Sequence, residues 1–145
     1  MKRNKITNER GFSLMELLIV MVILGLLAAL VGPTFWRHES RAKLQSAKSQ
    51  ISLFETAIDT YRLEVGKFPT TDQGLQALRA RPQGVEKWGG PYLPKNIPPD
   101  PWENAYDYKS PGEHGDYDII SYGADGQSGG EGEDQDVVNW KNIGE

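Results

Sequence analysis

Two hydrophobic patterns follow one another along the first 65 residues. Only two polar residues, Ser13 and Glu16, interrupt the stretch 12–31, and about 20 apolar residues allow a helix to cross a membrane. Farther along, apolar residues recur at spacings of three and four, which places them on one stripe of a helix; they are Leu44, Ala47, Ile51, Phe54, Ile58, Tyr61 and Val65. The pattern predicts a helix over residues 12–65 with a membrane half and an amphipathic half.

Two glycines and a proline bear on the continuity and the end of this helix. Pro33 lacks an N–H group and its ring clashes with the preceding turn, and Gly32 weakens the same turn. A bend or a melted segment is therefore expected within residues 28–34. A boundary between a membrane helix and a separate soluble helix explains the same residues equally well. Gly66, directly after Val65, predicts the end of the helix.

The middle of the chain predicts an ordered loop. Residues 67–104 are rich in Pro and Gly, so long regular elements cannot persist there. Residues 71–81 are the exception, because Leu and Ala residues within them favour a short helix capped by Thr70 or Thr71.

Two short strands are predicted after this loop. Residues 105–109 and 117–122 are aromatic and β-branched, and the turn-forming residues 111–115 lie between them. The sequence therefore predicts an α+β fold, in which the long N-terminal helix packs on a small C-terminal antiparallel sheet with long ordered loops.

Composition limits the chemistry that this chain can perform. Its 145 residues, 38% of them hydrophobic, suit one domain with a modest core. The absence of cysteine excludes disulfides, cysteine-ligated metals and thiol nucleophiles. The net charge of −4 conceals a basic stretch, because residues 1–11 carry four of the 16 Lys and Arg residues and one of the 20 acidic residues. The remainder is strongly acidic, so no nucleic-acid partner is expected.

The basic stretch before the apolar run has three interpretations, which differ in where the chain is cut. An ordinary secretory signal needs small residues at its cleavage site, but Ala28 and Ala29 are followed by bulky apolar residues. A plain uncleaved anchor fits the length, although it does not explain Glu16, because a carboxylate within a span costs up to a few kcal/mol. A position at the cytoplasmic interface, where its carboxylate reaches water, is the alternative account of Glu16.

The third interpretation comes from a local motif. Gly11 to Glu16 read G-F-S-L-M-E between the basic stretch and the apolar run, and this resembles the type IV prepilin signal. The resemblance implies that a prepilin peptidase cuts after Gly11 and methylates the new amino terminus of Phe12, so the helix is kept. It also implies that Glu16 pairs during assembly with the amino group of Phe12 on a neighbouring subunit, where two charges neutralise each other.

Further motifs resemble one branch of that superfamily, the major pseudopilins of the type II secretion system. They are Y-R-L-E-V-G-K-F-P-T-T-D-Q-G-L-Q-A-L from Tyr61, D-P-W-E-N-A-Y from Asp100, Y-G-A-D-G from Tyr122, and N-W at Asn139 and Trp140. The resemblance covers nearly the whole chain and implies the main subunit of a short periplasmic fibre that expels folded proteins through an outer-membrane channel. No enzymatic activity is expected.

The resemblance also implies an organisation, a location and partners. Residues 1–11 are a leader, 12–34 a transmembrane and fibre-core helix, and 35–145 a periplasmic head that includes the second half of the helix. The protein would cross the inner membrane once, surrounded by lipid, before entering a periplasmic pseudopilus. Its partners would be copies of itself in a helical homopolymer, minor pseudopilins, the prepilin peptidase and an inner-membrane assembly platform.

The C-terminal loop is acidic and rich in glycine. Residues 110–140 contain eight acidic residues and no Lys or Arg, so repulsion would disorder a loop without a cation. Oxygen-bearing side chains alternate with glycines, which let the backbone turn its carbonyls inward, and this composition suits calcium. The spacing does not match an EF-hand, and a solvated acidic loop remains open.

Major pseudopilins hold one calcium ion in this loop, and the resemblance implies its ligands here. Asp125 and Asp136 match the acidic ligands, and the backbone carbonyl of Tyr122 matches a further one. Asp134 and Ser128 complete the predicted set, in a segment where this sequence departs from the family pattern, since Gln135 replaces an acid found in some members.

Two other functions compete with secretion. A type IV pilin or a DNA-uptake (competence) pseudopilin shares the N-terminal motif, but such pilins usually end in a disulfide-closed loop that this chain cannot form. A membrane-tethered enzyme would have only His38 and His114 as imidazole groups, without a nearby nucleophile or phosphate-binding motif.

Overall fold

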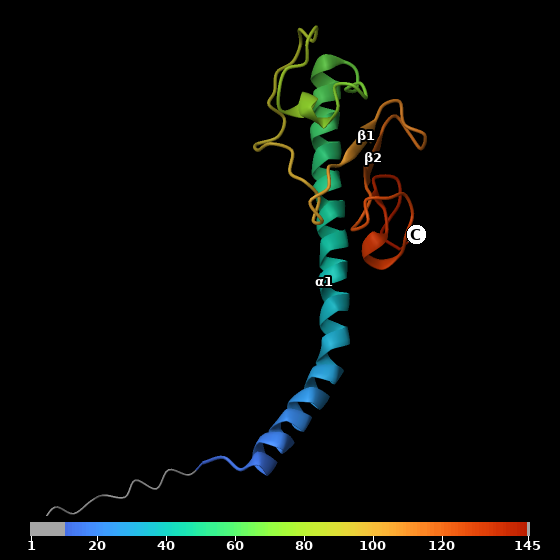
Figure 1. The fold of residues 1–145 in the computed structure, drawn as a ribbon. Coiled ribbons are helices and arrows are strands. Elements are labelled where there is room, and N and C mark those ends of the chain that lie inside the picture. Colours follow the sequence, from blue (N-terminus) through green and yellow to red (C-terminus); the bar gives the residue numbers. More distant parts are fainter. Residues whose placement is uncertain (1–10, 145) are drawn as a thin grey trace, which may run out of the picture. The chain divides into compact units, whose positions relative to one another are not determined.

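A computed structural model describes residues 11–144, and for residues 31–38 it describes the backbone alone. Residues 1–10 of the predicted leader lie outside the described residues. The elements follow the order α1, η1, β1, β2, η2, β3, shown in Figure 1. The chain divides into two compact units, residues 1–38 and 39–145, and α1 contributes residues to both.

Helix α1 spans Leu14–Val65 and begins two residues later than predicted. The Ser13 hydroxyl accepts a hydrogen bond from the Glu16 amide at 3.2 Å, which caps the first turn. At the other end Gly66 has φ 89° and donates its N–H to the Arg62 carbonyl at 2.8 Å, so the predicted stop is confirmed.

Helix α1 is continuous through residues 28–34. The predicted melted segment and the alternative of two separate helices are therefore both wrong for this structure. Pro33 removes one N–H donor from α1, and the helix continues past it.

The first unit presents apolar side chains on all sides of its helix. The large apolar residues of 14–30 are exposed, including Leu14 at 88% and Leu30 at 77%. Within the part of the chain described down to its side chains, no helix combines the length and apolarity of a membrane span. The segment predicted to cross the membrane, 12–34, continues into residues whose side chains lie outside that part.

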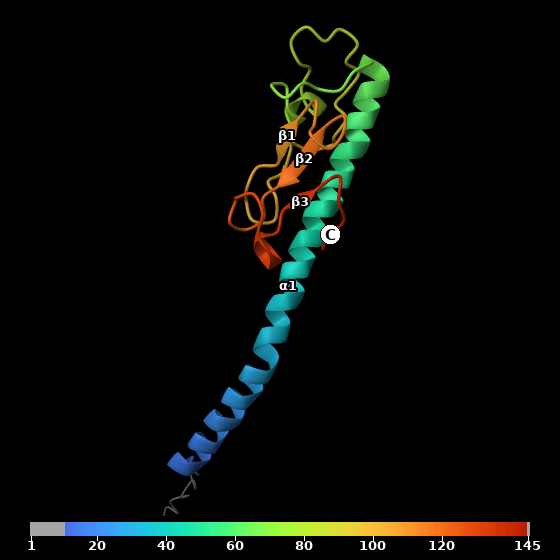
Figure 2. The same ribbon diagram turned by 90° about the vertical axis from the view of Figure 1, so that its right-hand side faces the viewer.

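The second unit contains a three-stranded antiparallel sheet in the order β1-β2-β3. Its strands are β1 (Asp107–Lys109), β2 (Asp118–Ser121) and β3 (Val137–Val138), and they lie alongside the second half of α1 (Figure 2). The predicted hairpin is confirmed, with both strands shorter than expected. The sequence pattern missed β3, because two residues carry no periodicity.

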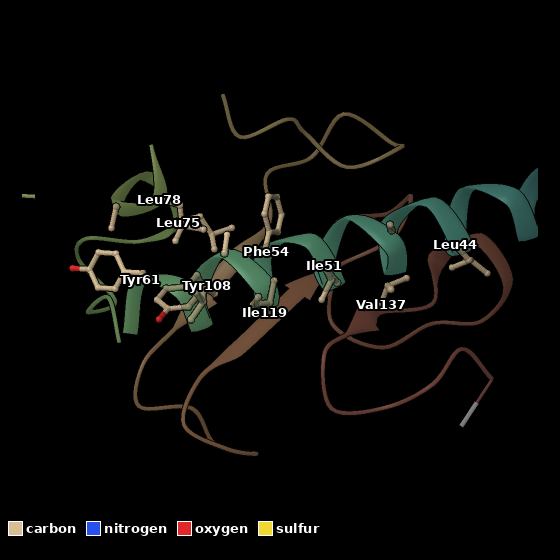
Figure 3. Close-up of a cluster of buried hydrophobic side chains, with 13 residues drawn as sticks. Leu44, Ile51, Phe54, Tyr61, Leu75, Leu78, Tyr108, Ile119 and Val137 are labelled. Carbon is tan, nitrogen blue, oxygen red and sulfur yellow. The ribbon is translucent and has the colours of Figure 1, made fainter. Parts of the chain in front are cut away.

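The core lies between α1 and this sheet. Six of the seven predicted stripe residues are buried, and Val65 is packed at the edge. Figure 3 shows the helix residues Phe54 and Tyr61 gathered with Tyr108 and Ile119 of the sheet. The ring of Phe54 meets that of Tyr106 edge to face, with centroids 5.1 Å apart.

The segment between α1 and β1 is largely irregular, as the Pro and Gly content predicts. The predicted short helix is a single 3₁₀ turn, η1 (Leu75–Leu78), which buries three of its four residues. Thr70 caps the turn before η1, because its hydroxyl accepts from the Gln73 amide at 3.3 Å. Its own amide donates to the Gln73 side chain at 3.0 Å. Gly74 precedes η1, so the predicted threonine cap of the helix itself is wrong.

Candidate functional site

The N-terminal motif lies at the start of α1. Gly11, Phe12 and Ser13 precede α1 without regular structure, and the Phe12 side chain is 82% exposed. A peptidase needs accessible chain outside regular structure at the bond that it cuts, and Gly11 and Phe12 are both exposed and lie outside the helix. Cleavage there would leave the new amino group four residues before Glu16.

Glu16 lies in the first turn of α1 and is exposed. A carboxylate at this position interacts favourably with the partial positive charge of the helix N-terminus. In the isolated chain Glu16 is therefore compatible with a local helix-stabilising role. A role in assembly requires a positive charge from outside the chain or from the mature amino terminus.

The acidic loop, residues 122–136, doubles back on itself between β2 and β3. The Ala124 amide donates to the Glu133 carbonyl at 2.9 Å, which joins its two arms near the end of β2. The Gly129 amide donates to Asp136 Oδ2 at 2.9 Å, which joins the tip of the loop to the residue before β3. A short 3₁₀ turn, η2 (Gly132–Asp134), lies between these contacts.

Two glycines make this close packing possible. Gly123 and Gly130 have φ of 64° and 88°, a left-handed conformation that favours glycine. A Cβ at Gly123 would lie 2.6 Å from the Glu133 carbonyl oxygen, and one at Gly130 would lie 2.5 Å from that of Asp134. Both positions therefore require the absence of a side chain.

The predicted ligands differ in their surroundings. Asp125 is exposed and its Oδ1 accepts from the Gln127 amide at 3.0 Å. Ser128 and Asp134 are also exposed, whereas Tyr122 and Asp136 are half-buried. Asp136 is the most informative of the set, because its Oδ1 is shielded from solvent and has no hydrogen-bond partner. A buried carboxylate oxygen without a partner is costly unless a cation meets it.

The structure does not gather the predicted carboxylates around one point. Among the described residues, no group of three or more His, Asp or Glu side chains is placed to hold a metal ion. Calcium does not require such a group, because it accepts backbone carbonyls, hydroxyls and water alongside one or two carboxylates. Burial raises the pKa of the Tyr122 hydroxyl, and the nearby carboxylates of Asp107 and Asp136 raise this pKa further. The effect of the two carboxylates shows that the charge around Tyr122 is negative.

Comparisons with known proteins cover both the N-terminal motif and the rest of the chain. Residues 6–32 match the family described as "Prokaryotic N-terminal methylation motif". Residues 34–140, well over half of the chain, match the family described as "Type II secretion system (T2SS), protein G". The chain belongs to the type II secretion protein G family.

Relatives within this family align over nearly the whole length. The type II secretion system core protein G of Vibrio cholerae is 44% identical over 139 residues, covering 94% of both chains. That of Pseudomonas aeruginosa is 42% identical over 137 residues, covering 92% of this chain and 96% of the relative. The crystal structure of the major pseudopilin of enterohaemorrhagic Escherichia coli superposes with a TM-score of 0.62 at 34% identity, covering 71% of this chain and 90% of that one. The predicted resemblance to major pseudopilins and the predicted α+β fold are thereby confirmed.

Two family motifs contribute asparagine side chains that form hydrogen bonds near the two ends of the acidic loop. In D-P-W-E-N-A-Y, the Asn104 side-chain amide donates to the Gly123 carbonyl at 2.9 Å, at the start of the loop. In the C-terminal motif, the Asn139 Oδ1 accepts from the Ile119 amide at 2.9 Å, just after the loop. Sequence reasoning identified both motifs without predicting these roles, since each depends on residues far along the chain.

The described histidine is a structural residue. The His114 ring stacks on Trp140 with centroids 3.8 Å apart, and its Nδ1 lies 3.0 Å from Asp118 Oδ2. The side chain of His38 lies outside the described residues. Sequence reasoning missed the His114–Trp140 contact, because nothing in the spacing of two residues on separate loops indicates it.

Proposed function

We propose that this chain is the major structural subunit of the periplasmic pseudopilus, whose assembly drives export of folded proteins across the outer membrane. The observation that carries the proposal is the match to the protein G family over residues 34–140, joined to a methylation motif over residues 6–32. Relatives named core protein G and a solved relative named major pseudopilin support it. The chain would act by polymerising, and it would catalyse no reaction.

Deletion of the gene tests this function. Secretion of folded exoproteins should stop in the deletion strain and return when the intact gene is supplied. Intact secretion with loss of twitching motility or of transformation would contradict the proposal and favour a type IV pilin or a DNA-uptake pseudopilin.

The exposed apolar helix supports an inner-membrane anchor before assembly. Leu14 to Val31 contain a single charged residue, Glu16, and exposed apolar surface of this extent needs lipid or another protein around it. We place residues 12–34 in the membrane, the basic residues before Gly11 in the cytoplasm and residues 35–145 in the periplasm. Minor pseudopilins and an inner-membrane platform would be the partners during assembly.

Glu16 would then drive entry into the fibre. A carboxylate within lipid is costly, and pairing with the amino terminus of Phe12 on a neighbouring subunit would remove that cost. Replacing Glu16 by Leu should leave a processed, membrane-inserted protein that does not form fibres, whereas Glu39→Leu, on the same helix, should assemble. Normal fibres from Glu16→Leu, seen by shearing and electron microscopy, would contradict this role.

Calcium is the cation that best fits the acidic loop. Asp125, Asp136 and the Tyr122 carbonyl would supply ligands, with Ser128 and Asp134 completing the set. The support is the unpartnered, buried Oδ1 of Asp136 together with the oxygen-rich composition of the loop. The ion would neutralise the repulsion among the acidic residues and so hold the two arms together.

Thermal melting of the full chain in detergent micelles tests the metal. Calcium should raise the melting temperature, EDTA should lower it, and Asp125→Ala should abolish the difference between the two conditions. Asp72→Ala, an exposed carboxylate outside the loop, is the matched control and should retain the difference. An unchanged wild-type melting temperature in EDTA would remove the calcium proposal and leave the pseudopilus proposal intact.

A further inference from the structure

The ammonium group of Lys48 on α1 contacts several backbone carbonyls of the chain just after the acidic loop. Its Nζ donates to the carbonyl of Val138 at 2.6 Å and to that of Lys141 at 2.7 Å, and lies 3.5 Å from that of Asn139. Three carbonyl oxygens from four consecutive residues thus surround one ammonium group. The C-terminal segment runs beside α1 in both ribbon views (Figures 1 and 2).

The segment that Lys48 contacts is also joined to the sheet, because Asn139 exchanges hydrogen bonds with Ile119 of β2. Among the contacts of the described residues, however, only Lys48 bonds it to α1 through its backbone carbonyls. Strand β3 consists of Val137 and Val138 only, and it pairs through Ile120 and Ser121 of β2. A two-residue strand at the edge of a sheet is marginal by itself. Its last residue, Val138, is also the residue whose carbonyl makes the shortest contact with Lys48.

Strand β3 directly follows Asp136, the residue whose carboxylate closes the acidic loop on Gly129. Any shift of β3 along or away from β2 would move Asp136 relative to Tyr122, which directly follows Ser121 of β2. The register of this short pair therefore fixes the distance between the two ends of the acidic loop, and Lys48 contacts the last residue of the pair from the helix.

We propose that Lys48 is a positioning residue for calcium, which fixes β3 and thereby holds Asp136 in place to bind the ion in the acidic loop. This inference rests on the proposed calcium site. Lys48 acts through backbone carbonyls, as a hydrogen-bonded partner of the polypeptide, and does not touch the ion.

The sign of the effect separates positioning from simple electrostatics. A positive charge near a calcium site repels the ion, so loss of the Lys48 charge alone would tighten calcium binding. Loss of positioning would weaken it, because residues that orient metal ligands typically contribute about 10-fold to 100-fold in affinity. The two mechanisms predict opposite changes from the same substitution.

Calcium titration of the full, processed chain in detergent micelles, followed by calorimetry, is the test. Lys48→Met removes the ammonium and keeps the length, and Lys48→Arg keeps the charge and the donors. Lys43→Met is the matched control, because Lys43 lies on the same helix and forms an ion pair with Glu39, 3.5 Å away. It removes the same charge without touching β3.

The expected result is calcium affinity lowered at least about tenfold by Lys48→Met, nearly restored by Lys48→Arg and not lowered by Lys43→Met. Unchanged or tighter binding by Lys48→Met would overturn the inference while the calcium proposal stands. A wild-type chain that binds no calcium would end both proposals.

Hydrogen exchange without calcium gives a second measurement that does not depend on the metal. In Lys48→Met the amides of Ala124 and Gly129, which close the acidic loop, should exchange several-fold faster. The helix amides of Ile51 and Phe54 should keep their protection, which would show that the variant is folded. Equal exchange at Ala124 and Gly129 in both proteins would overturn the inference.

Discussion

The carboxylate of Asp100 and the hydroxyl of Ser121 form a buried hydrogen bond between the loop before β1 and the last residue of β2. The Ser121 Oγ donates to Asp100 Oδ2 at 2.6 Å, and the two residues are 0% and 3% exposed. Asp100 Oδ1 accepts from the amides of Trp102 at 3.0 Å and Asn104 at 2.8 Å. One carboxylate therefore folds the D-P-W-E-N loop and attaches it to the sheet, next to the acidic loop.

Replacing Asp100 by Ala should strongly destabilise the head. The substitution leaves the Ser121 hydroxyl and two amides without their acceptor, at a cost of about 3 kcal/mol in the free energy of unfolding. Urea unfolding of the full chain in micelles, followed by near-UV circular dichroism, measures this. Asp72→Ala should stay within about 0.5 kcal/mol of wild type. A similarly small effect for Asp100→Ala would contradict the stabilising role of the Asp100 carboxylate.

Acid should weaken the contact between the β1–β2 turn and β2. Burial opposes ionisation of Asp118, but hydrogen bonds from the His114 ring and from the amides of Glu113 and His114 hold its pKa below the ordinary 3.8. A depressed pKa means that this stability is present above pH about 3.8 and is lost as the pH falls through the lower, folded-state value.

Asp118→Asn tests this pH dependence. The variant should unfold about 2 kcal/mol more easily than wild type at pH 7, and the difference should shrink below pH 3.8. Urea unfolding at a series of pH values measures both quantities. A difference that stays constant into strong acid would mean that the Asp118 carboxylate contributes no pH-dependent stability.

Local and periodic features of the fold could be predicted from the sequence. The stripe from Leu44 to Tyr61 is buried as its spacing predicts, because one face of a helix repeats on a fixed period. The end of α1 at Gly66 is equally local. Strand β3 could not be predicted, because Val137 and Val138 become a strand only through pairing with β2.

The candidate site also has a local part that the sequence predicts and a part, made by distant contacts, that it does not. The G-F-S-L-M-E motif is contiguous, so the sequence alone identified Gly11, Phe12 and Glu16 as candidates. The acidic loop depends on contacts between separate segments, such as that of the Asn104 side chain with the Gly123 carbonyl, which no local pattern encodes. Composition could predict a cation there, but it could not predict which oxygen atoms lie without a partner.

Gly123→Ala should unfold the acidic loop without unfolding the core. The new Cβ would lie 2.6 Å from the Glu133 carbonyl, and φ is 64° at this position, so strain of about 1–3 kcal/mol is expected. Calcium-dependent stabilisation should be lost, while helix content by far-UV circular dichroism is unchanged. Gly115→Ala, where a Cβ meets nothing within 4 Å, is the control. Retained calcium stabilisation in Gly123→Ala would show that the loop tolerates a side chain there.

Gly11→Val should block processing and leave an unmethylated precursor in the inner membrane. The reason lies in recognition by the peptidase rather than in folding, because a Cβ at Gly11 meets nothing within 4 Å. Gly25→Val is the matched control, since a Cβ at Gly25 also meets nothing within 4 Å and the residue lies inside α1, after the motif. Mass spectrometry of the amino terminus should find methylated Phe12 in wild type and Gly25→Val, and residues 1–11 still attached in Gly11→Val. Normal cleavage of Gly11→Val would show that the peptidase does not read this glycine, and the assignment of the leader would then be wrong.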